Sequence, residues 1–395
     1  MSMAQKALIV ADGKCPVDSI VAGVSLLLLL SGLIMVASAS TEVSAKLYGS
    51  PFHLVTRHAA YIFISTATGA FVLLVPMNYW QKLGIPLLAL SFLLLIAVLV
   101  PGIGKEVNGA ARWISLGSFT LQGSEFVKLF VVLYLAGYLV RQKEEVQSSF
   151  AALLKPLAIV TPLVLLLLGQ PDFGATVVIM SAFMGVIFLA GIPMRYLLPV
   201  VSVSAVAISF IAILQPYRLA RLTVFTDPWE HQFGGGYQLT QALIAFGRGE
   251  WFGLGLGNSI QKLFFLPEAH TDFLFSIIAE ELGVVGAATI IVLFACLIIR
   301  ALWIGYRAQI QGEDFHALTA YGIALLLGVQ TLVNLGVNLG MLPTKGLTLP
   351  LMSYGGNSLI VSCMLIAILL RIEYECRSGV ENSTASATNR SRKRG

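Results

Sequence analysis

Ten long apolar runs constrain the fold of this chain more than any other feature of its sequence. The runs are approximately Ile20–Ser38, Ala59–Val75, Ile85–Val100, Glu125–Val140, Pro156–Leu168, Ala175–Ala190, Leu197–Leu214, Phe273–Ile299, Ala317–Gly340 and Ser358–Leu370. A helix needs roughly 20 apolar residues to cross the hydrocarbon core of a bilayer. Strand-length segments of alternating hydrophobicity, the mark of an outer-membrane barrel, are absent. The sequence therefore predicts an all-α integral membrane protein, built as a bundle of ten transmembrane helices.

Composition excludes two other classes of protein. Hydrophobic residues make up 57% of the 395 residues and charged residues only 11%, against roughly 25% charged residues in soluble domains. A disordered chain would combine few apolar residues with a high net charge, whereas the net charge here is +5. The chain is therefore neither a soluble globular enzyme nor a disordered protein.

The distribution of Lys and Arg predicts the orientation of the bundle. With the N-terminus inside, 15 of the 25 basic residues lie on the inner side and nine on the outer side, with Lys128 inside the fourth span. Cytoplasmic segments carry the excess of basic residues, so both termini are predicted to be cytoplasmic. The small residues at 37–39 also fit a signal-peptidase site, but the long polar leader and the further spans favour an uncleaved anchor.

The chain is predicted to contain one membrane domain, residues 1–372, and a polar, basic tail, residues 373–395. The tail composition predicts a disordered cytoplasmic segment that can touch anionic lipid headgroups or a cytosolic partner. Residues 215–271 form a large outer loop between spans seven and eight, and long loops are commonly functional. Eight glycines between Gly234 and Gly257 predict close backbone approach or re-entrant folding in this loop.

Three titratable residues stand together where the outer loop enters the eighth span. Glu268, His270 and Asp272 precede the apolar residues that begin at Phe273. One interpretation is structural, with Asp272 or Thr271 capping the helix N-terminus. The other is chemical, because a carboxylate beside apolar surface tends to have the raised pKa that a general base requires.

A second set of ionisable residues lies within the membrane. Glu125 and Lys128 stand three residues apart on the fourth span, so they share a helix face and can form an ion pair. Such residues are functional candidates by default, although a purely structural pair fits the spacing equally. Asp172, between the fifth and sixth spans, and the Glu280-Glu281 pair of the eighth span extend this set.

A third cluster, Lys345 to Ser358, is rich in proline and glycine and includes Ser353. It fits either a turn or an irregular outer segment lining a polar cavity, the only place where such backbone is tolerated at membrane depth. Lys345 and Arg112 add positive charge on the outer side, and each also fits a solvated residue. The histidines and cysteines lack metal-ligand spacing, so the sequence specifies no metal site.

Several short motifs together make the sequence resemble the SEDS (shape, elongation, division and sporulation) family. The matching stretches are Asn108 to Ile114, Glu125 with Lys128, Gln170 to Gly174, Gly236 to Gln238, Gly253 to Ser259, Lys262 to Gly283 and Pro350 to Ser358. Each motif alone is modest, but their order along ten spans is specific. The string from Lys262 to Phe273 favours the cell-division branch over the elongation branch.

The resemblance implies a peptidoglycan glycosyltransferase that polymerises lipid II into glycan strands at the outer face of the bacterial inner membrane, during septal cell-wall synthesis. Asp272 is the predicted catalytic residue. The implied partners are lipid II, the nascent strand, a class B penicillin-binding protein (FtsI) and other division proteins, with no nucleic acid. A divalent cation, Mg²⁺ or Mn²⁺, suits a pyrophosphate substrate and carboxylates, and no organic cofactor is expected. The predicted substrate-binding residues are Lys128, Glu125, Arg112, Glu268, His270, Lys345, Ser353 and Asp172.

Two alternative functions fit some of the same residues. A lipid II flippase would use Glu125 and Lys128 as a headgroup path, but it should place polar groups along the whole membrane depth, whereas the ionisable residues gather toward the outer half. A non-catalytic division scaffold is the second alternative, but it assigns no role to Asp272 or Lys128.

Overall fold

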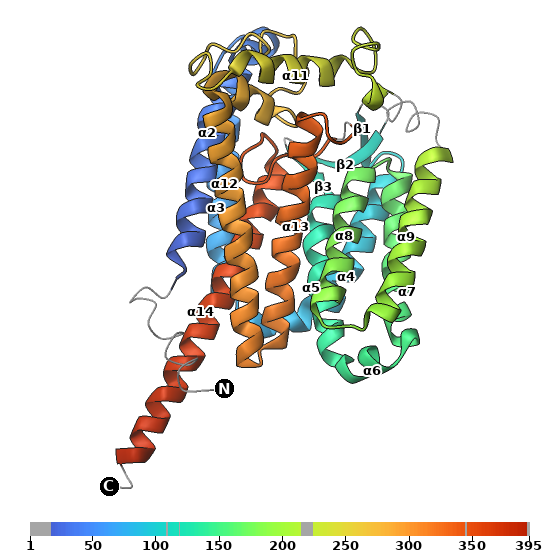
Figure 1. Cartoon of the computed structure of the whole chain (residues 1–395), viewed down its shortest axis with the longest axis vertical. Helices are drawn as coiled ribbons and strands as arrows, with labels where there is room; N and C mark the ends of the chain where they lie inside the picture. Colours follow the sequence, from blue (N-terminus) through green and yellow to red (C-terminus); the bar gives the residue numbers. More distant parts are fainter. Residues whose placement is uncertain (1–16, 108–109, 118, 215–223, 344–345, 393–395) are drawn as a thin grey trace.

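The chain folds into a bundle of long, roughly parallel helices that is capped at one end by loops, one helix and a small sheet (Figure 1). The computed structural model describes residues 17–107, 110–117, 119–214, 224–343 and 346–392. The elements are α2 (Ser19–Tyr48), α3 (His53–Leu74), α4 (Met77–Leu99), β1 (Gly104–Val107), β2 (Ala110–Leu116), β3 (Phe119–Gln122), α5 (Gly123–Arg141), α6 (Lys143–Ser148), α7 (Phe150–Gly169), α8 (Phe173–Leu189), α9 (Met194–Leu214), α11 (Tyr237–Gly249), α12 (Leu274–Gln311), α13 (Asp314–Asn338) and α14 (Gly356–Arg392).

Each of the ten predicted apolar runs lies within one of these helices or extends past its end by at most two residues, because in a bilayer only helices satisfy all their backbone groups within one segment. Seven described helices, α2, α3, α4, α5, α7, α12 and α13, are long and apolar enough to cross a membrane. The apolar parts of α8 and α9 are shorter, and α14 contains the tenth run. The all-α membrane fold is confirmed, and ten crossings stay a prediction.

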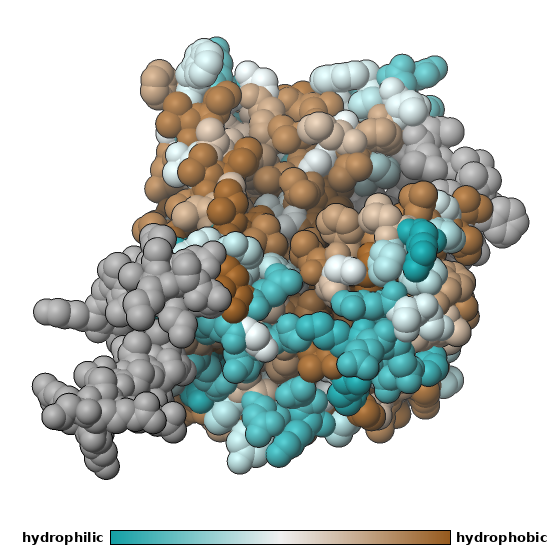
Figure 2. Space-filling model, turned by 60° about the horizontal axis from the view of Figure 1, so that its bottom comes forward, coloured by the Kyte–Doolittle hydropathy of each residue, from teal (hydrophilic) through white to brown (hydrophobic). Residues whose placement is uncertain are grey.

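Helices α5 and α13 form the centre of the bundle. Most residues in the apolar stretch of each are buried, whereas the other five spans bury fewer than half of the residues in theirs. The outer helices therefore present apolar side chains to lipid. Figure 2 shows this belt above an end of the molecule where hydrophilic side chains gather.

A three-stranded antiparallel sheet, ordered β1-β2-β3, precedes α5 and was missed by the sequence analysis. Trp113 lies opposite Lys105 on one side and Gln122 on the other, and the register of β1 against β2 shifts between Lys105 and Glu106. The strands are four to seven residues long, shorter than the strands that span a membrane. The sheet lies at the same end of the bundle as α11 (Figure 1).

The predicted outer loop is only partly loop. Its described part, residues 224–271, includes α11, which lies across the end of the bundle (Figure 1) and packs against α12 and α13. The predicted close backbone approach is present, because a Cβ on Gly249 would lie 1.9 Å from the Ala279 carbonyl oxygen and one on Gly253 would lie 2.2 Å from that of Glu281.

The predicted boundary at residue 372 falls inside α14, and the division into a membrane domain and a tail stays a prediction. The Glu373 side chain is buried and forms ion pairs with Arg307 at 2.7 Å and Arg377 at 2.6 Å. Helix α14 itself runs on to Arg392. The charged composition of residues 373–395 predicted a solvated tail, but Glu373 and Arg377, at its start, are paired within the bundle.

Candidate active site

Asp272 lies at the capped end of the bundle, directly before α12. The helix N-cap is Phe273 and no side chain caps it, so the predicted capping role of Asp272 is wrong. The Asp272 backbone is instead held by α13, since its carbonyl oxygen accepts hydrogen bonds from Asn334 Nδ2 at 2.9 Å and Asn338 Nδ2 at 3.0 Å.

A tight turn around Glu268 presents the Asp272 side chain. The Glu268 backbone is left-handed, with φ of 59°, and its carbonyl oxygen accepts from Thr271 N at 3.1 Å and Phe273 N at 3.2 Å. The Glu268 carboxylate accepts from Thr271 Oγ1 at 2.7 Å. Residues held in such sparsely populated conformations cluster at functional sites.

The environment of Asp272 favours the protonated carboxyl. Burial, and then repulsion from Glu268, raise the pKa of Asp272 from 3.8 to about 7, and Arg112 opposes this shift. No described residue donates a hydrogen bond to its carboxylate. A carboxylate with a pKa near neutrality can both take and release a proton, as general acid–base chemistry requires.

Three aromatic rings pack behind this turn. The Tyr354 ring lies 5.5 Å from the His270 ring and 5.8 Å from the His58 ring, measured between centroids, and Tyr354 N donates to the His270 carbonyl oxygen at 3.0 Å. Burial lowers the pKa of His270 despite the nearby Glu268, so this imidazole is neutral at pH 7. The sequence analysis missed His58, which stands alone within an apolar span and gives no signal there.

A column of amide side chains on α13 fixes the segment that the sequence analysis assigned to a third cluster. Gln330, Asn334 and Asn338 are four residues apart and share one helix face. Gln330 Nε2 donates to the Thr348 carbonyl oxygen at 2.9 Å and Asn334 Nδ2 to that of Leu347 at 2.6 Å. These amides were missed, although three amides spaced by four within an apolar span are a readable signal.

The predicted Glu125–Lys128 ion pair is present within α5, with 2.8 Å between Glu125 Oε2 and Lys128 Nζ. Lys128 also donates to Gln330 Oε1 at 2.7 Å. Gln330 binds Thr348 and Asn334 binds the preceding residue, Leu347. Asn334 also donates to the Asp272 carbonyl oxygen, so the buried ion pair is connected to the Asp272 backbone through these two amides and the segment that they hold. The two sets of ionisable residues found in the sequence therefore belong to one polar network.

The remaining predicted binding residues have partners within the fold or lie elsewhere. Arg112, on β2, donates to the carbonyl oxygens of Gln170 at 3.3 Å and Pro171 at 2.7 Å. Asp172 caps α8 by accepting from Ala175 N, and buried Ser353 accepts from Leu349 N at 2.9 Å. Lys345 lies outside the described residues. Substrate binding by these residues stays a prediction.

Glu280 and Glu281 on α12 hold the chain segment that leads to Asp272. Glu280 accepts from Ile260 N at 3.2 Å and from Ser259 Oγ. Glu281 pairs with Lys262 at 3.0 Å and accepts from Ser38 Oγ at 2.6 Å. Both carboxylates are fully buried, and their contacts position the segment rather than leave a charge free for a ligand.

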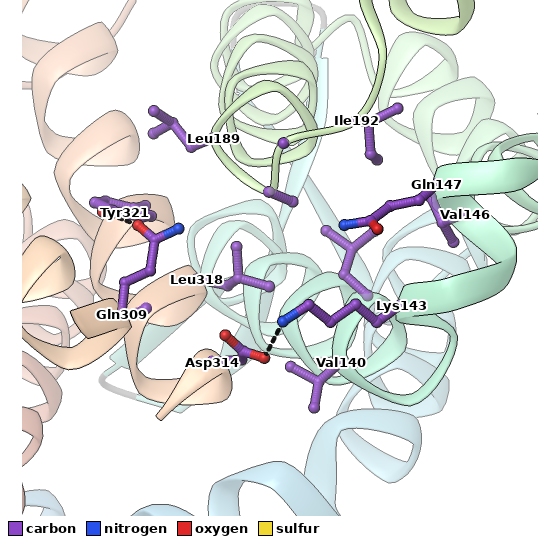
Figure 3. A pocket seen from close by; sticks show the side chains of 14 residues that line it. Val140, Lys143, Val146, Gln147, Leu189, Ile192, Gln309, Asp314, Leu318 and Tyr321 are labelled. Atoms are coloured by element: carbon purple, nitrogen blue, oxygen red, sulfur yellow. Dashed lines mark hydrogen bonds and ion pairs between the residues drawn. The ribbon is translucent and has the colours of Figure 1, made fainter. Parts of the chain in front are cut away.

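A cavity of about 310 Å³ opens at the opposite end of the bundle, around the Lys143–Asp314 ion pair (Figure 3). Asp314 begins α13, whereas Asn338, which contacts Asp272, ends it. Those 24 residues correspond to about 36 Å of helix at 1.5 Å per residue. The cavity is therefore remote from the candidate active site.

The described residues contain no group of three or more His, Cys, Asp or Glu arranged to hold a metal ion. Asp272 and Glu268 do bring two carboxylates close enough to repel each other. Two oxygen donors suit a hard divalent cation only when a ligand completes its shell.

Fold and site define a class: a multi-pass membrane protein with a titratable carboxylate at one end of the bundle, whose backbone is held by a polar network that includes a buried ion pair. Residues 18–378 match the cell cycle protein family that comprises FtsW, RodA and SpoVE. The chain belongs to this family, so the SEDS resemblance is confirmed.

Relatives and solved structures agree with this assignment. The chain is 51% identical to the probable peptidoglycan glycosyltransferase FtsW of Legionella pneumophila, covering 89% of each chain, and 51% identical to that of Pseudomonas fluorescens, covering 89% of this chain and 87% of the relative. It resembles a chain of a peptidoglycan synthase complex that coordinates polymerization and crosslinking, with a TM-score of 0.76, 28% identity, and coverage of 91% of this chain and 98% of that one. Thermus thermophilus RodA gives a TM-score of 0.67 at 29% identity, covering 90% of this chain and 96% of that one.

Proposed function

We propose that this chain is a peptidoglycan glycosyltransferase that polymerises lipid II at the outer face of the bacterial inner membrane. The observation that carries the proposal is the Asp272 carboxylate, whose pKa is raised to about 7 at the membrane face where a lipid-linked sugar would lie. The names of the FtsW relatives support the reaction class.

The reaction assigns a proton transfer to Asp272. A hydroxyl of the acceptor sugar attacks the anomeric carbon of the donor, so that a carbon–oxygen bond forms there while the bond to the pyrophosphate oxygen breaks. The hydroxyl proton passes to the Asp272 carboxylate, and the lipid pyrophosphate leaves with the bonding electron pair. Positioned general bases contribute roughly 10²- to 10⁴-fold to such steps.

The departing pyrophosphate needs positive charge placed in advance. Arg112 lowers the pKa of Asp272, so its guanidinium acts on the site electrostatically, and Lys128 lies deeper in the same network. Glu268 and Asp272 would hold a divalent cation together with the substrate pyrophosphate, and Mg²⁺ or Mn²⁺ would supply charge neutralisation there. The neutral His270 would add a hydrogen-bonding group without adding charge.

The cellular setting completes the proposal. The Asp272 end faces outward and both termini lie in the cytoplasm of the bacterial cell, as the Lys and Arg distribution predicts. A class B penicillin-binding protein (FtsI) crosslinks the strands, and the protein works with other division proteins at the septum. The likeness to a chain of a peptidoglycan synthase complex supports such a partner.

The test is polymerisation by purified protein. Wild-type protein with its presumptive partner is incubated with labelled lipid II, a divalent salt and a penicillin, beside Asp272→Asn and the control Asp314→Asn at the opposite end. Polymer from wild type and control, with none from Asp272→Asn, is the expected result. Polymer from Asp272→Asn at the wild-type rate would overturn the role of Asp272. Lipid II crossing vesicle bilayers with no polymer from any protein would favour a flippase.

A further inference from the structure

A short loop of the outer segment carries large apolar side chains that are exposed on the surface of the fold. This loop, residues 250–257, is called the aromatic loop here. Its Trp251 side chain is 69% exposed and its Phe252 side chain 82%, and Leu254 and Leu256 are also exposed. Exposed apolar clusters of this kind mark contact with a partner or a membrane.

The aromatic loop is fixed in place by backbone hydrogen bonds to a break in α12. The helix is interrupted at Gly283, with φ of 68° and ψ of −168°. Val284 N donates to the Glu250 carbonyl oxygen at 2.9 Å and Val285 N to that of Trp251 at 3.2 Å. In return the loop donates from Leu254 N and Gly255 N to α12 carbonyl oxygens, both at 3.0 Å.

The exposure pattern of α12 gives the depth of this break. All residues from Leu274 to Glu281 are buried, whereas exposed apolar residues recur from Val284 to Trp303. Those 19 residues correspond to about 29 Å of helix, which matches the roughly 30 Å thickness of the hydrocarbon core.

The far end of the same stripe has the features of a membrane interface. The guanidinium groups of Arg300 and Arg307 lie over the Trp303 ring, 4.0 and 4.5 Å from its centroid. Aromatic and basic residues gather where a span leaves the hydrocarbon core. If Trp303 marks one boundary, Val284 marks the other, and Trp251 is hydrogen-bonded beside it.

We propose that the aromatic loop is an interfacial anchor that inserts Trp251 and Phe252 into the lipid headgroup region of the leaflet at the Asp272 end. Its surface is continuous with the lipid-facing stripe of α12, and Trp is the residue type that interfaces favour. The occupant is therefore the bilayer surface. This inference depends on membrane embedding and is independent of the proposed enzymatic activity.

The anchor has a consequence for the candidate active site. The residues that receive its hydrogen bonds, Glu280 and Glu281, also hold the segment from Ser259 to Lys262 through their side chains. That segment leads directly to Asp272. The anchor thus fixes the height of the Asp272 turn relative to lipid headgroups, where a lipid-linked substrate would present its pyrophosphate.

Fluorescence quenching in vesicles tests the anchor. The whole protein is reconstituted into vesicles containing lipids brominated near the top of the acyl chain, and the emission of wild type is compared with that of Trp251→Phe. Trp229→Phe is the matched control. Trp229 lies in the same outer segment and is 52% exposed, but it is outside the aromatic loop that is hydrogen-bonded to the break in α12. These conservative changes leave the other four tryptophans in place.

The expected result is that Trp251→Phe removes an emission component that bromolipid quenches and aqueous iodide does not. A removed component that iodide alone quenches would overturn the proposal. A component protected from both quenchers would also overturn it, and would indicate a protein contact. If Trp251→Phe lowers protein yield, the double variant Trp251→Leu with Phe252→Leu is used instead, and it should still float with vesicles. Adding Leu254→Trp to this double variant places a tryptophan in the same loop, and its emission is measured with bromolipid and with iodide.

Discussion

The two ends of the bundle differ in how the fold treats their carboxylates. At the end where α14 leaves the bundle, the buried carboxylates among the described residues form ion pairs: Asp18 accepts from the α2 backbone and pairs with Arg300 at 2.7 Å, and Glu373 pairs with Arg307 and Arg377. At the other end, Glu280 and Glu281 are also paired, but no described residue donates to the Asp272 carboxylate, and Glu268 repels it. The fold therefore stabilises the charge of the paired carboxylates and disfavours the charge of Asp272.

The difference separates structural charge from functional charge. A buried ion that is paired and hydrogen-bonded adds conformational restraint, and the pairs near Glu373 connect α2, α12 and α14. A carboxylate whose pKa is raised by desolvation costs free energy when it is charged, so it persists only where the surrounding structure enforces its position. Four α13 hydrogen bonds, two to the Asp272 carbonyl and two to the neighbouring segment, supply that enforcement.

Asp272→Asn should give the largest effect, because it removes the proposed general base. We expect glycosyl transfer to fall by roughly 10²- to 10⁴-fold. In the wild type, transfer should rise as the pH passes about 7, where the carboxyl loses its proton. Initial rates of polymer formation between pH 5.5 and 8.5 measure both effects, and a flat wild-type profile would contradict the assignment.

The same substitution should raise stability at alkaline pH. The raised pKa means that the fold favours the protonated carboxyl, so a penalty develops as the pH rises from the ordinary pKa of 3.8 to about 7. Asp272→Asn carries no such penalty. Its unfolding temperature should exceed that of the wild type at pH 8 by more than at pH 5, and thermal unfolding in detergent compares them.

Lys128→Met should cost about 3–5 kcal/mol of stability, because it leaves Glu125 buried without a cation. The double variant Glu125→Gln with Lys128→Met should recover most of this loss. Arg307→Met is the comparison at the opposite end and should cost less, since Glu373 keeps Arg377. A stable double variant that still fails to polymerise lipid II would place the pair in the reaction, whereas wild-type activity would make it purely structural.

Asn334→Leu should cost roughly 1–3 kcal/mol, the penalty for a buried polar group left without its partner. The change removes donors to the carbonyl oxygens of Leu347 and Asp272. Thr331→Val on the same helix is the control, because the Thr331 hydroxyl is buried without a partner among the described residues and its loss should cost little. Equal destabilisation by both changes would argue against the amide column as the support of the site.

The sequence predicted the helices and singled out Asp272 as a candidate, but it did not predict the contacts that support this residue. Apolar runs predict spans directly, since only helices and closed barrels span a bilayer. An aspartate directly before an apolar run can likewise be recognised from the sequence alone. The Gly283 break and the contacts of Lys262 depend on residues 19 or more positions away or on backbone conformation, which no local pattern reports. Ser353 and Asp172 were predicted to bind substrate, and the fold gives both of them backbone partners.

Lys143→Met should have the smallest effect, and it tests whether the comparison between the two ends extends to the cavity of Figure 3. Its ion pair with Asp314 is 2.7 Å long, but the two side chains are 55% and 33% exposed, and exposed pairs contribute about 0–1 kcal/mol. We expect a stability change within this range and unchanged polymerisation, measured by thermal unfolding and by the lipid II assay. Asp314→Asn should match it, because either change removes the same pair. A large loss of activity in both variants, with stability intact, would mean that the opposite end does more than hold the bundle together. The pair lies about 36 Å of helix away from Asp272. At that distance it could affect activity without altering the fold only by contacting another molecule.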